Sequence, residues 1–64
     1  MSKHVIYYFM EHDGNLLQAY FITKSHWSTN VGFATKFDTF LEAAYQIKEL
    51  SKSPFLKELK IEMI

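Results

Sequence analysis

Residues 3–24 of the chain, KHVIYYFMEHDGNLLQAYFITK, contain two runs of strand-forming side chains separated by Asp13-Gly14. Valine, isoleucine, tyrosine and phenylalanine are enriched in β-strands. Asp-Gly is a strong hairpin signal because a type I′ turn requires a positive φ at both of its central residues. The stretch therefore predicts an antiparallel hairpin with strands over residues 3–11 and 16–24.

Counting outward from this turn assigns each side chain of the hairpin to one of two faces. On the first face the expected pairs are His12 with Asn15, Met10 with Leu17, Tyr8 with Ala19, Ile6 with Phe21 and His4 with Thr23. On the second face they are Glu11 with Leu16, Phe9 with Gln18, Tyr7 with Tyr20, Val5 with Ile22 and Lys3 with Lys24. A turn at Gly14-Asn15 would shift the pairs by two residues and leave every side chain on its face.

The rest of the chain predicts a loop, a helix and a last strand. Residues 25–32 have the composition of a loop. Residues 33–37 alternate large with small or polar side chains, as a short third strand does. Residues 57–64 alternate apolar with charged side chains, which predicts the last strand.

The helix is expected to begin after Asp38, because Thr39 and Glu42 form a T-x-x-E capping box. In that motif each side chain satisfies the free backbone N–H of the other residue. The apolar stripe that follows comprises Phe40, Ala43, Ala44, Ile47 and Leu50. Ser53-Pro54 ends the helix, since proline disfavours helical geometry in the residue before it.

These elements give one domain, residues 1–64, of the α+β class. The expected order is ββ(β)αβ, a small antiparallel sheet of three to four strands with one amphipathic helix packed on one face. A chain this short buries only about 60% of the surface that its unfolded form exposes, so such domains commonly rely on disulfides, a metal or a partner. The lack of cysteine excludes disulfides and thiolate zinc sites, which favours association.

Both faces of the predicted hairpin are apolar, although one helix covers only one of them. The helix is expected on the face of Ile6, and the second face would then remain open. A solvated face carries polar side chains, and exposed apolar patches rich in tyrosine mark interfaces. The predicted partner-binding residues are Tyr7, Phe9, Tyr20 and Ile22, with Trp27 at the edge.

Two questions stay open at this point. The loop that carries Trp27 could fold back beneath the sheet and cover Val5 and Phe9, and Trp27 would then be a lid on the core rather than an anchor for a partner. Leu41 and Tyr45 lie beside the apolar stripe of the helix and either extend the core or contact a partner. The core is the preferred interpretation for these two residues.

The sequence predicts no catalytic residue, no cofactor and no metal site. His4 and His12 would lie more than about 20 Å apart along a strand, so they cannot share an ion, and adding His26 gives too few ligands. No serine has a base at a meaningful spacing, and no carboxylates pair on an apolar face. Gly14 and Gly32 stand alone, without a phosphate-binding loop.

The charges of the chain cancel, with seven lysines, seven acidic residues and no arginine. A near-zero net charge removes the long-range field that attracts nucleic acids and acidic membranes, and it removes the repulsion between copies. The chain has neither the layout of a signal peptide nor a long apolar run. Together with the lack of cysteine, this predicts a cytoplasmic protein without membrane contact.

Residues 37–45, FDTFLEAAY, resemble the strand-to-helix junction of AP2-type DNA-binding domains. Those domains place a helix behind a three-stranded antiparallel sheet, so the resemblance implies a similar arrangement here. AP2-type domains read DNA with arginines and tryptophan on the sheet, and this chain lacks arginine, so DNA binding does not carry over. The alternative function is a small binder of single-stranded nucleic acid that stacks bases on Tyr7, Phe9 and Tyr20.

The layout of the chain is similar to that of short proteins encoded by bacteriophages and prophages. These have a hairpin, a Trp-bearing loop and the pattern A-x-x-F-x-T-x-x-E-A before a helix and a last strand. The matching residues are Ala34, Phe37, Thr39, Glu42 and Ala43. Characterised examples often block a host protein, as anti-CRISPR proteins do. The resemblance implies a non-catalytic protein–protein interaction module that inhibits or modulates a host protein and could also form a homodimer.

Overall fold

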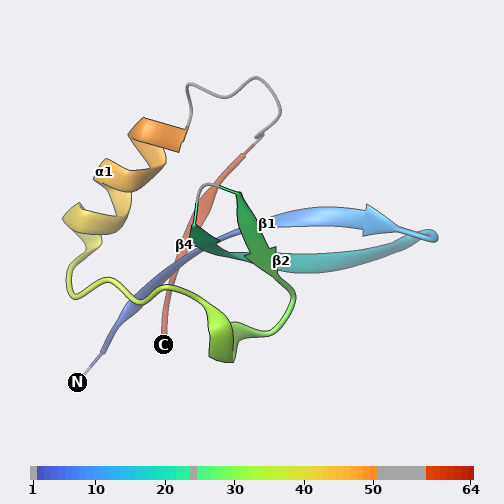
Figure 1. Ribbon diagram of the computed structural model, residues 1–64, viewed down its shortest axis with the longest axis horizontal. Helices are drawn as coiled ribbons and strands as arrows, with labels where there is room; N and C mark the ends of the chain where they lie inside the picture. The colour runs from blue at the N-terminus through green and yellow to red at the C-terminus, as the bar shows by residue number, and fades with distance from the viewer. Residues whose placement is uncertain (1, 24, 51–57) are drawn as a thin grey trace.

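The computed structural model describes residues 2–23, 25–50 and 58–64. The elements in chain order are β1 (His4–His12), β2 (Asn15–Thr23), β3 (His26–Ser28), the 3₁₀ helix η1 (Val31–Phe33), α1 (Phe40–Leu50) and β4 (Lys60–Met63). The strands form one antiparallel sheet in the order β3-β2-β1-β4, and α1 packs against one face of it (Figure 1). The predicted α+β fold is confirmed.

The turn between β1 and β2 has the predicted geometry. Asp13 has φ 51° and Gly14 has φ 79°, and His12 pairs with Asn15 on either side of them. From there the register runs inward as predicted until Tyr7 pairs with Tyr20. Beyond that pair the two strands separate, so the expected pairs from Ile6 with Phe21 to His4 with Thr23 do not form.

Residues 35–37 fill the gap between the separated strands. The His4 N–H donates to the Phe37 carbonyl and the Phe37 N–H donates to the His4 carbonyl, both at 2.8 Å, while the Thr35 N–H donates to the Phe21 carbonyl at 2.9 Å. His4 and Phe21 lie an even number of residues from the paired His12 and Asn15, so their backbone groups point at the opposite strand. Residues 35–37, called here the wedge, therefore satisfy groups that a longer hairpin would pair directly.

The third strand does not lie over residues 33–37 as predicted. The third strand is β3, within the expected loop, and the segment after it forms η1 followed by an isolated bridge between Phe37 and His4. Asn30 explains the start of η1, because its side-chain Oδ1 accepts from the Gly32 N–H at 2.8 Å. This is the capping role that short polar side chains favour.

The helix and the last strand agree with their sequence patterns. The Glu42 N–H donates to Thr39 Oγ1 at 3.1 Å, which is the threonine half of the capping box. The predicted helix end at Ser53-Pro54 lies outside the described residues. β4 pairs with the outer edge of β1, from Met63 opposite His4 to Lys60 opposite Tyr7.

Two apolar clusters lie on the two faces of the sheet. The larger one is under α1 and centres on four buried residues, Ile6, Phe21, Ala43 and Leu50, with Trp27, Phe37, Ile47, Leu59 and Ile61 packed against them. The smaller one, on the opposite face, consists of Val5, Tyr20 and Ala34, with Tyr7 against it. Because Ala34 belongs to the segment between η1 and the wedge, the chain covers part of the face that the sequence leaves open.

The end of the hairpin extends beyond the rest of the sheet (Figure 1). β4 pairs with β1 only as far as Tyr7, and β3 pairs with β2 only from Tyr20 onward. Residues 8–19, called here the projecting hairpin, consequently pair with each other and with no other described strand.

Candidate interaction surfaces

The predicted contact face of the hairpin is partly covered. Val5 is fully buried and Tyr20 is 8% exposed, with Ala34 against both in one cluster. The Tyr20 hydroxyl donates to Gln18 Oε1 at 3.3 Å. Burial raises the pKa of Tyr20, with smaller contributions from Glu62 and Tyr7. The chain itself therefore covers Val5 and Tyr20, which is the alternative that the sequence left open. The covering residue is Ala34, however, and not the loop that carries Trp27.

Trp27 packs on the helix-bearing face. β3 pairs it with Phe21, and its ring lies edge-on to Phe21 and to Tyr8, with centroid separations of 5.4 and 5.0 Å. Directly paired residues on antiparallel strands point to the same side of the sheet, which explains its position. Trp27 therefore covers the core under α1, and a role for it in binding a partner stays a prediction.

Phe9 is the exposed member of the predicted contact set. It is 50% exposed, whereas Tyr7 and Ile22 are half-buried. The Tyr7 ring lies 5.6 Å from that of Phe9 and 5.9 Å from that of Tyr20, so the three form a row across the face. The predicted binding role of these residues stays a prediction, and Phe9 is the one that a partner reaches without rearrangement.

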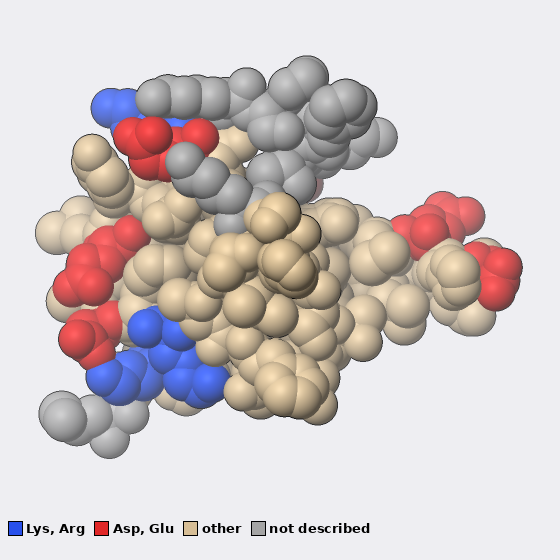
Figure 2. All heavy atoms as spheres, viewed as in Figure 1, with Lys and Arg blue, Asp and Glu red and all other residues tan. Residues whose placement is uncertain are grey.

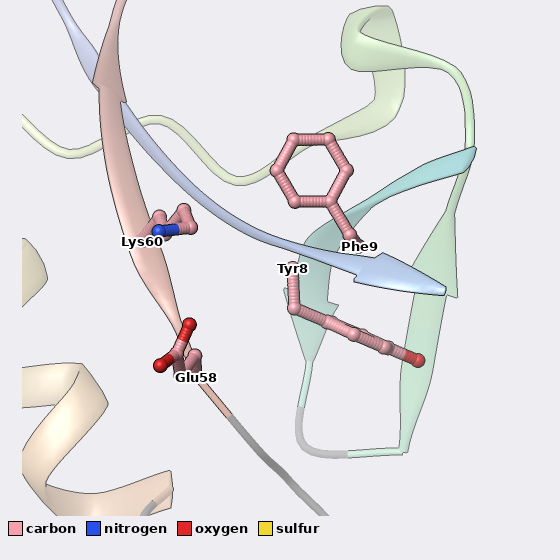
Figure 3. Close-up of a pocket in the computed structure, with 4 residues that line it drawn as sticks. All are labelled: Tyr8, Phe9, Glu58 and Lys60. Atoms are coloured by element: carbon pink, nitrogen blue, oxygen red, sulfur yellow. The ribbon is translucent and has the colours of Figure 1, made fainter. Parts of the chain in front are cut away.

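An open hollow of about 360 Å³ lies at the edge of β1, beside the end of β4. It is lined by Tyr8, Phe9, Glu58 and Lys60, and Figure 3 shows Tyr8 and Phe9 pointing away from each other on opposite sides of β1. The lining offers two aromatic rings and one charge of each sign.

The outer side of α1 carries a second apolar surface that sequence reasoning assigned to the core. Leu41 is 78% exposed, Tyr45 is 67% exposed and Phe40 is 57% exposed. We call Leu41 and Tyr45 the outer stripe. Phe40, which was expected in the core stripe, lies on the side of Ala43 at the first turn of α1 and is exposed there, with its ring edge-on to His4. At 100° per residue, Leu41 and Tyr45 lie on the side of the helix away from Ala43, which is fully buried. The preferred interpretation of Leu41 and Tyr45 as core residues is wrong, because both side chains are largely exposed, whereas Leu59 and Ile61 pack against the buried cluster.

Charges gather beside the start of α1 and at the tip of the hairpin. Figure 2 shows lysine and acidic side chains side by side near the N-terminus, acidic side chains at the hairpin end and an uncharged stretch between them. Lys3 Nζ donates to Asp38 Oδ1, and this bond lowers the pKa of Asp38. The pair ties the residue before β1 to the residue before the helix cap.

The histidines lie apart from one another in the structure. His12 is at the hairpin tip, with Nε2 3.4 Å from Asp13 Oδ2, while His26 Nδ1 lies 3.2 Å from Thr23 Oγ1. His4 Nδ1 is buried without a hydrogen-bond partner, and its ring meets Phe40 edge-on at 6.3 Å. Within residues 2–23, 25–50 and 58–64, no group of three or more His, Cys, Asp or Glu side chains is placed to hold a metal ion.

In the same described ranges, no helix has the length and hydropathy needed to span a bilayer. Comparison of the chain with protein-family models, with curated protein sequences and with solved structures gives no match.

Proposed function

We propose that the chain is a non-catalytic protein-binding module that contacts another protein through the outer stripe of α1. The observation that carries the proposal is the joint exposure of Leu41 and Tyr45 on one side of α1, while Ala43 and Leu50 on its other side are buried against the sheet. Exposed apolar patches on small proteins mark interaction sites. Fully burying a side chain such as Leu41 contributes about 1.5–3 kcal/mol.

The geometry supports recognition of the helix by a groove in the partner. Helix-in-groove complexes use apolar anchors spaced three and four residues apart, which Leu41 and Tyr45 provide. The anchors are held on a helix anchored to the sheet by Ala43 and Leu50, so binding orders few additional residues. Glu42, which is exposed, places an acidic side chain beside Leu41 at the start of this surface, which favours a basic group on the rim of the partner.

Stacking of single-stranded nucleic acid on the sheet has less support. Of the three rings proposed for that role, Tyr20 is buried and Tyr7 is half-buried, which leaves Phe9 exposed. Successive bases require successive accessible rings. Titration of a labelled oligonucleotide at two salt concentrations tests this alternative directly, since phosphate binding weakens as salt rises.

The test uses Leu41→Lys with Met63→Lys as its matched control. Both residues are exposed apolar side chains, at 78% and 64%, and each variant adds one positive charge. A tagged wild-type chain is used to capture its partner from the native cell, and the purified partner is then titrated with all three proteins. We expect Leu41→Lys to weaken binding at least about tenfold, as loss of an anchor does, and Met63→Lys to bind as the wild type does.

Circular dichroism should give the same folded spectrum for the three proteins, because exposed substitutions change the free energy of unfolding by about 0.5 kcal/mol or less. A partner that binds the folded Leu41→Lys variant as tightly as the wild type would show that the outer stripe is not the contact surface.

A further inference from the structure

The outer edge of β2 within the projecting hairpin has unpaired backbone groups. His12 and Asn15 form the pair next to a two-residue turn, so Asn15, Leu17 and Ala19 direct their N–H and C=O groups at β1. Leu16 and Gln18 direct theirs to the other side. β3 pairs with β2 only from Tyr20 onward, and no described segment lies beside Leu16 or Gln18 as a strand.

This edge has none of the features that normally prevent pairing with another chain. Natural edge strands carry lysine, proline or a bulge. Residues 15–19 read NLLQA, with no charge and no proline, and the irregularity of β2 lies farther along, between Phe21 and Thr23. Leu16 is 70% exposed and Leu17 is 37% exposed, on opposite faces of the strand.

We infer that a second copy of the chain pairs with this edge, so that two β2 strands lie antiparallel about a two-fold axis. The short length of the unpaired edge limits which strand can pair with it. A strand that docks there must end within about five residues, because Ser28 of β3 occupies the next position, opposite Tyr20. The projecting hairpin has this length, because it reverses direction at Asp13-Gly14.

The charges of the hairpin are compatible with this pairing. Glu11 lies on β1 and Asp13 in the turn, so neither lies on the edge where the copies meet. In the two-fold arrangement the Asp13 side chains lie at opposite ends of the paired strands, roughly 20 Å apart at 3.3 Å per residue. The net charge of zero adds no repulsion between the copies.

The position of β3 also fixes the register. A two-fold axis through Leu17 would place Gly14 of the partner subunit opposite Tyr20, where Ser28 already pairs. An axis through Leu16 avoids this conflict and places Gln18 opposite Gly14 of the partner subunit. Leu16 then faces Leu16 of the partner subunit as a hydrogen-bonded pair. The paired segment is shorter than the strands of stable dimer interfaces, so the dimer forms weakly and in a concentration-dependent manner.

Cysteine substitution tests the register, since the chain has no cysteine of its own. Directly opposed residues of a hydrogen-bonded antiparallel pair have Cα atoms about 5.5 Å apart, within the range that a disulfide spans. We expect Leu16→Cys to form a covalent dimer under mild oxidation. Met63→Cys, at a site that is 64% exposed on β4 at the opposite edge of the sheet, should stay largely monomeric at the same concentration. Equal cross-linking of the two variants would overturn the proposed register and surface.

Sedimentation of the full chain over a range of concentrations tests the association itself. The wild type and Leu41→Lys should show the same concentration-dependent shift from monomer to dimer, and Leu16→Lys should need at least about tenfold more protein for that shift. The inference does not depend on the function proposed for the outer stripe, and the two lysine variants separate the two claims. A wild-type chain that stays monomeric to millimolar concentration, or one whose edge captures a strand of another protein instead, would overturn it.

Discussion

Thr35 offers the sharpest test of the wedge. Its hydroxyl donates to the Ile22 carbonyl at 2.6 Å, and its N–H donates to the Phe21 carbonyl. Thr35→Val keeps the shape of the side chain and its preference for extended backbone but removes the hydroxyl. The wedge would keep its backbone bonds and lose one side-chain bond to β2.

The expected cost follows from the burial of this contact. A net hydrogen bond contributes about 0.5–1.5 kcal/mol, and a carbonyl left without a partner adds up to about 1–3 kcal/mol when it is buried. Because the contact is only partly buried, we expect a loss of about 1.5 kcal/mol in the free energy of unfolding. For a domain of this size, that lowers the Tm by about 6–12 °C.

Urea denaturation followed by circular dichroism measures this loss, with Thr23→Val as the matched control. Thr23 Oγ1 lies 3.2 Å from His26 Nδ1 at the exposed end of β2, so the same substitution there should change the free energy by about 0.5 kcal/mol or less. The slope of the transition should be the same for both variants, since neither changes the surface exposed on unfolding. Equal losses at positions 35 and 23 would refute the wedge as a stabilising element.

Three further predictions concern the core and the titratable groups. Ile6→Ala removes a fully buried side chain and should cost about 2–5 kcal/mol, enough to leave much of this small domain unfolded by circular dichroism at 25 °C. The bond from Lys3 lowers the pKa of Asp38, so the stabilising effect of this bond is present above the unfolded value of 3.8 and is lost as the pH falls through the folded value. An NMR titration of the Asp38 carboxyl should give a midpoint below 3.8, and Lys3→Met should raise that midpoint. Burial raises the pKa of Tyr20, so the contribution of this residue to the free energy of unfolding is full below the unfolded value of 10.0 and is lost as the pH rises through the folded value. Ultraviolet titration should show one tyrosine that ionises at higher pH than the others. Tyr7→Phe should lower the pKa of Tyr20 only slightly, because burial is the larger cause.

The parts of the fold that sequence predicts are those set by local chemistry. Asp13-Gly14 fixes the turn, because few residue pairs adopt two positive φ angles. Thr39 fixes the start of α1 through a bond to a residue three positions away. Alternation along the strands assigns Ile6 and Val5 to opposite faces, and both are buried on those faces.

The wedge escapes prediction because it results from competition between distant segments for the same backbone groups. Nothing in the local pattern of residues 33–37 shows that Phe37 will replace Thr23 as the neighbour of His4. The same holds for Ala34, whose small side chain fills the space over Val5 and Tyr20. The sequence pattern places Ala34 in a layout shared with other short proteins, and only the folded chain gives it a packing role.

The candidate surfaces were predicted less well than the fold. A helical wheel places Leu41 and Tyr45 beside the apolar stripe. Whether such flanking side chains are buried or exposed depends on how the helix sits on the sheet, and here both are exposed. The sequence does not single out the edge of β2, because the exposure of that edge follows from how short β3 is. The signal that could have found it is the uncharged run over residues 15–19, which contrasts with the lysine and glutamate of most exposed edges.

The way in which the wedge closes the sheet also affects how the chain folds. The hairpin joins neighbours in sequence and can form within about 1–10 µs, whereas the bridge between His4 and Phe37 closes a loop of more than 30 residues. Contacts of such high sequence separation slow folding. We therefore expect the hairpin tip to form early and the bridge between His4 and Phe37 to form last. In kinetic amide-exchange labelling, the Leu17 N–H should become protected before the Phe37 N–H.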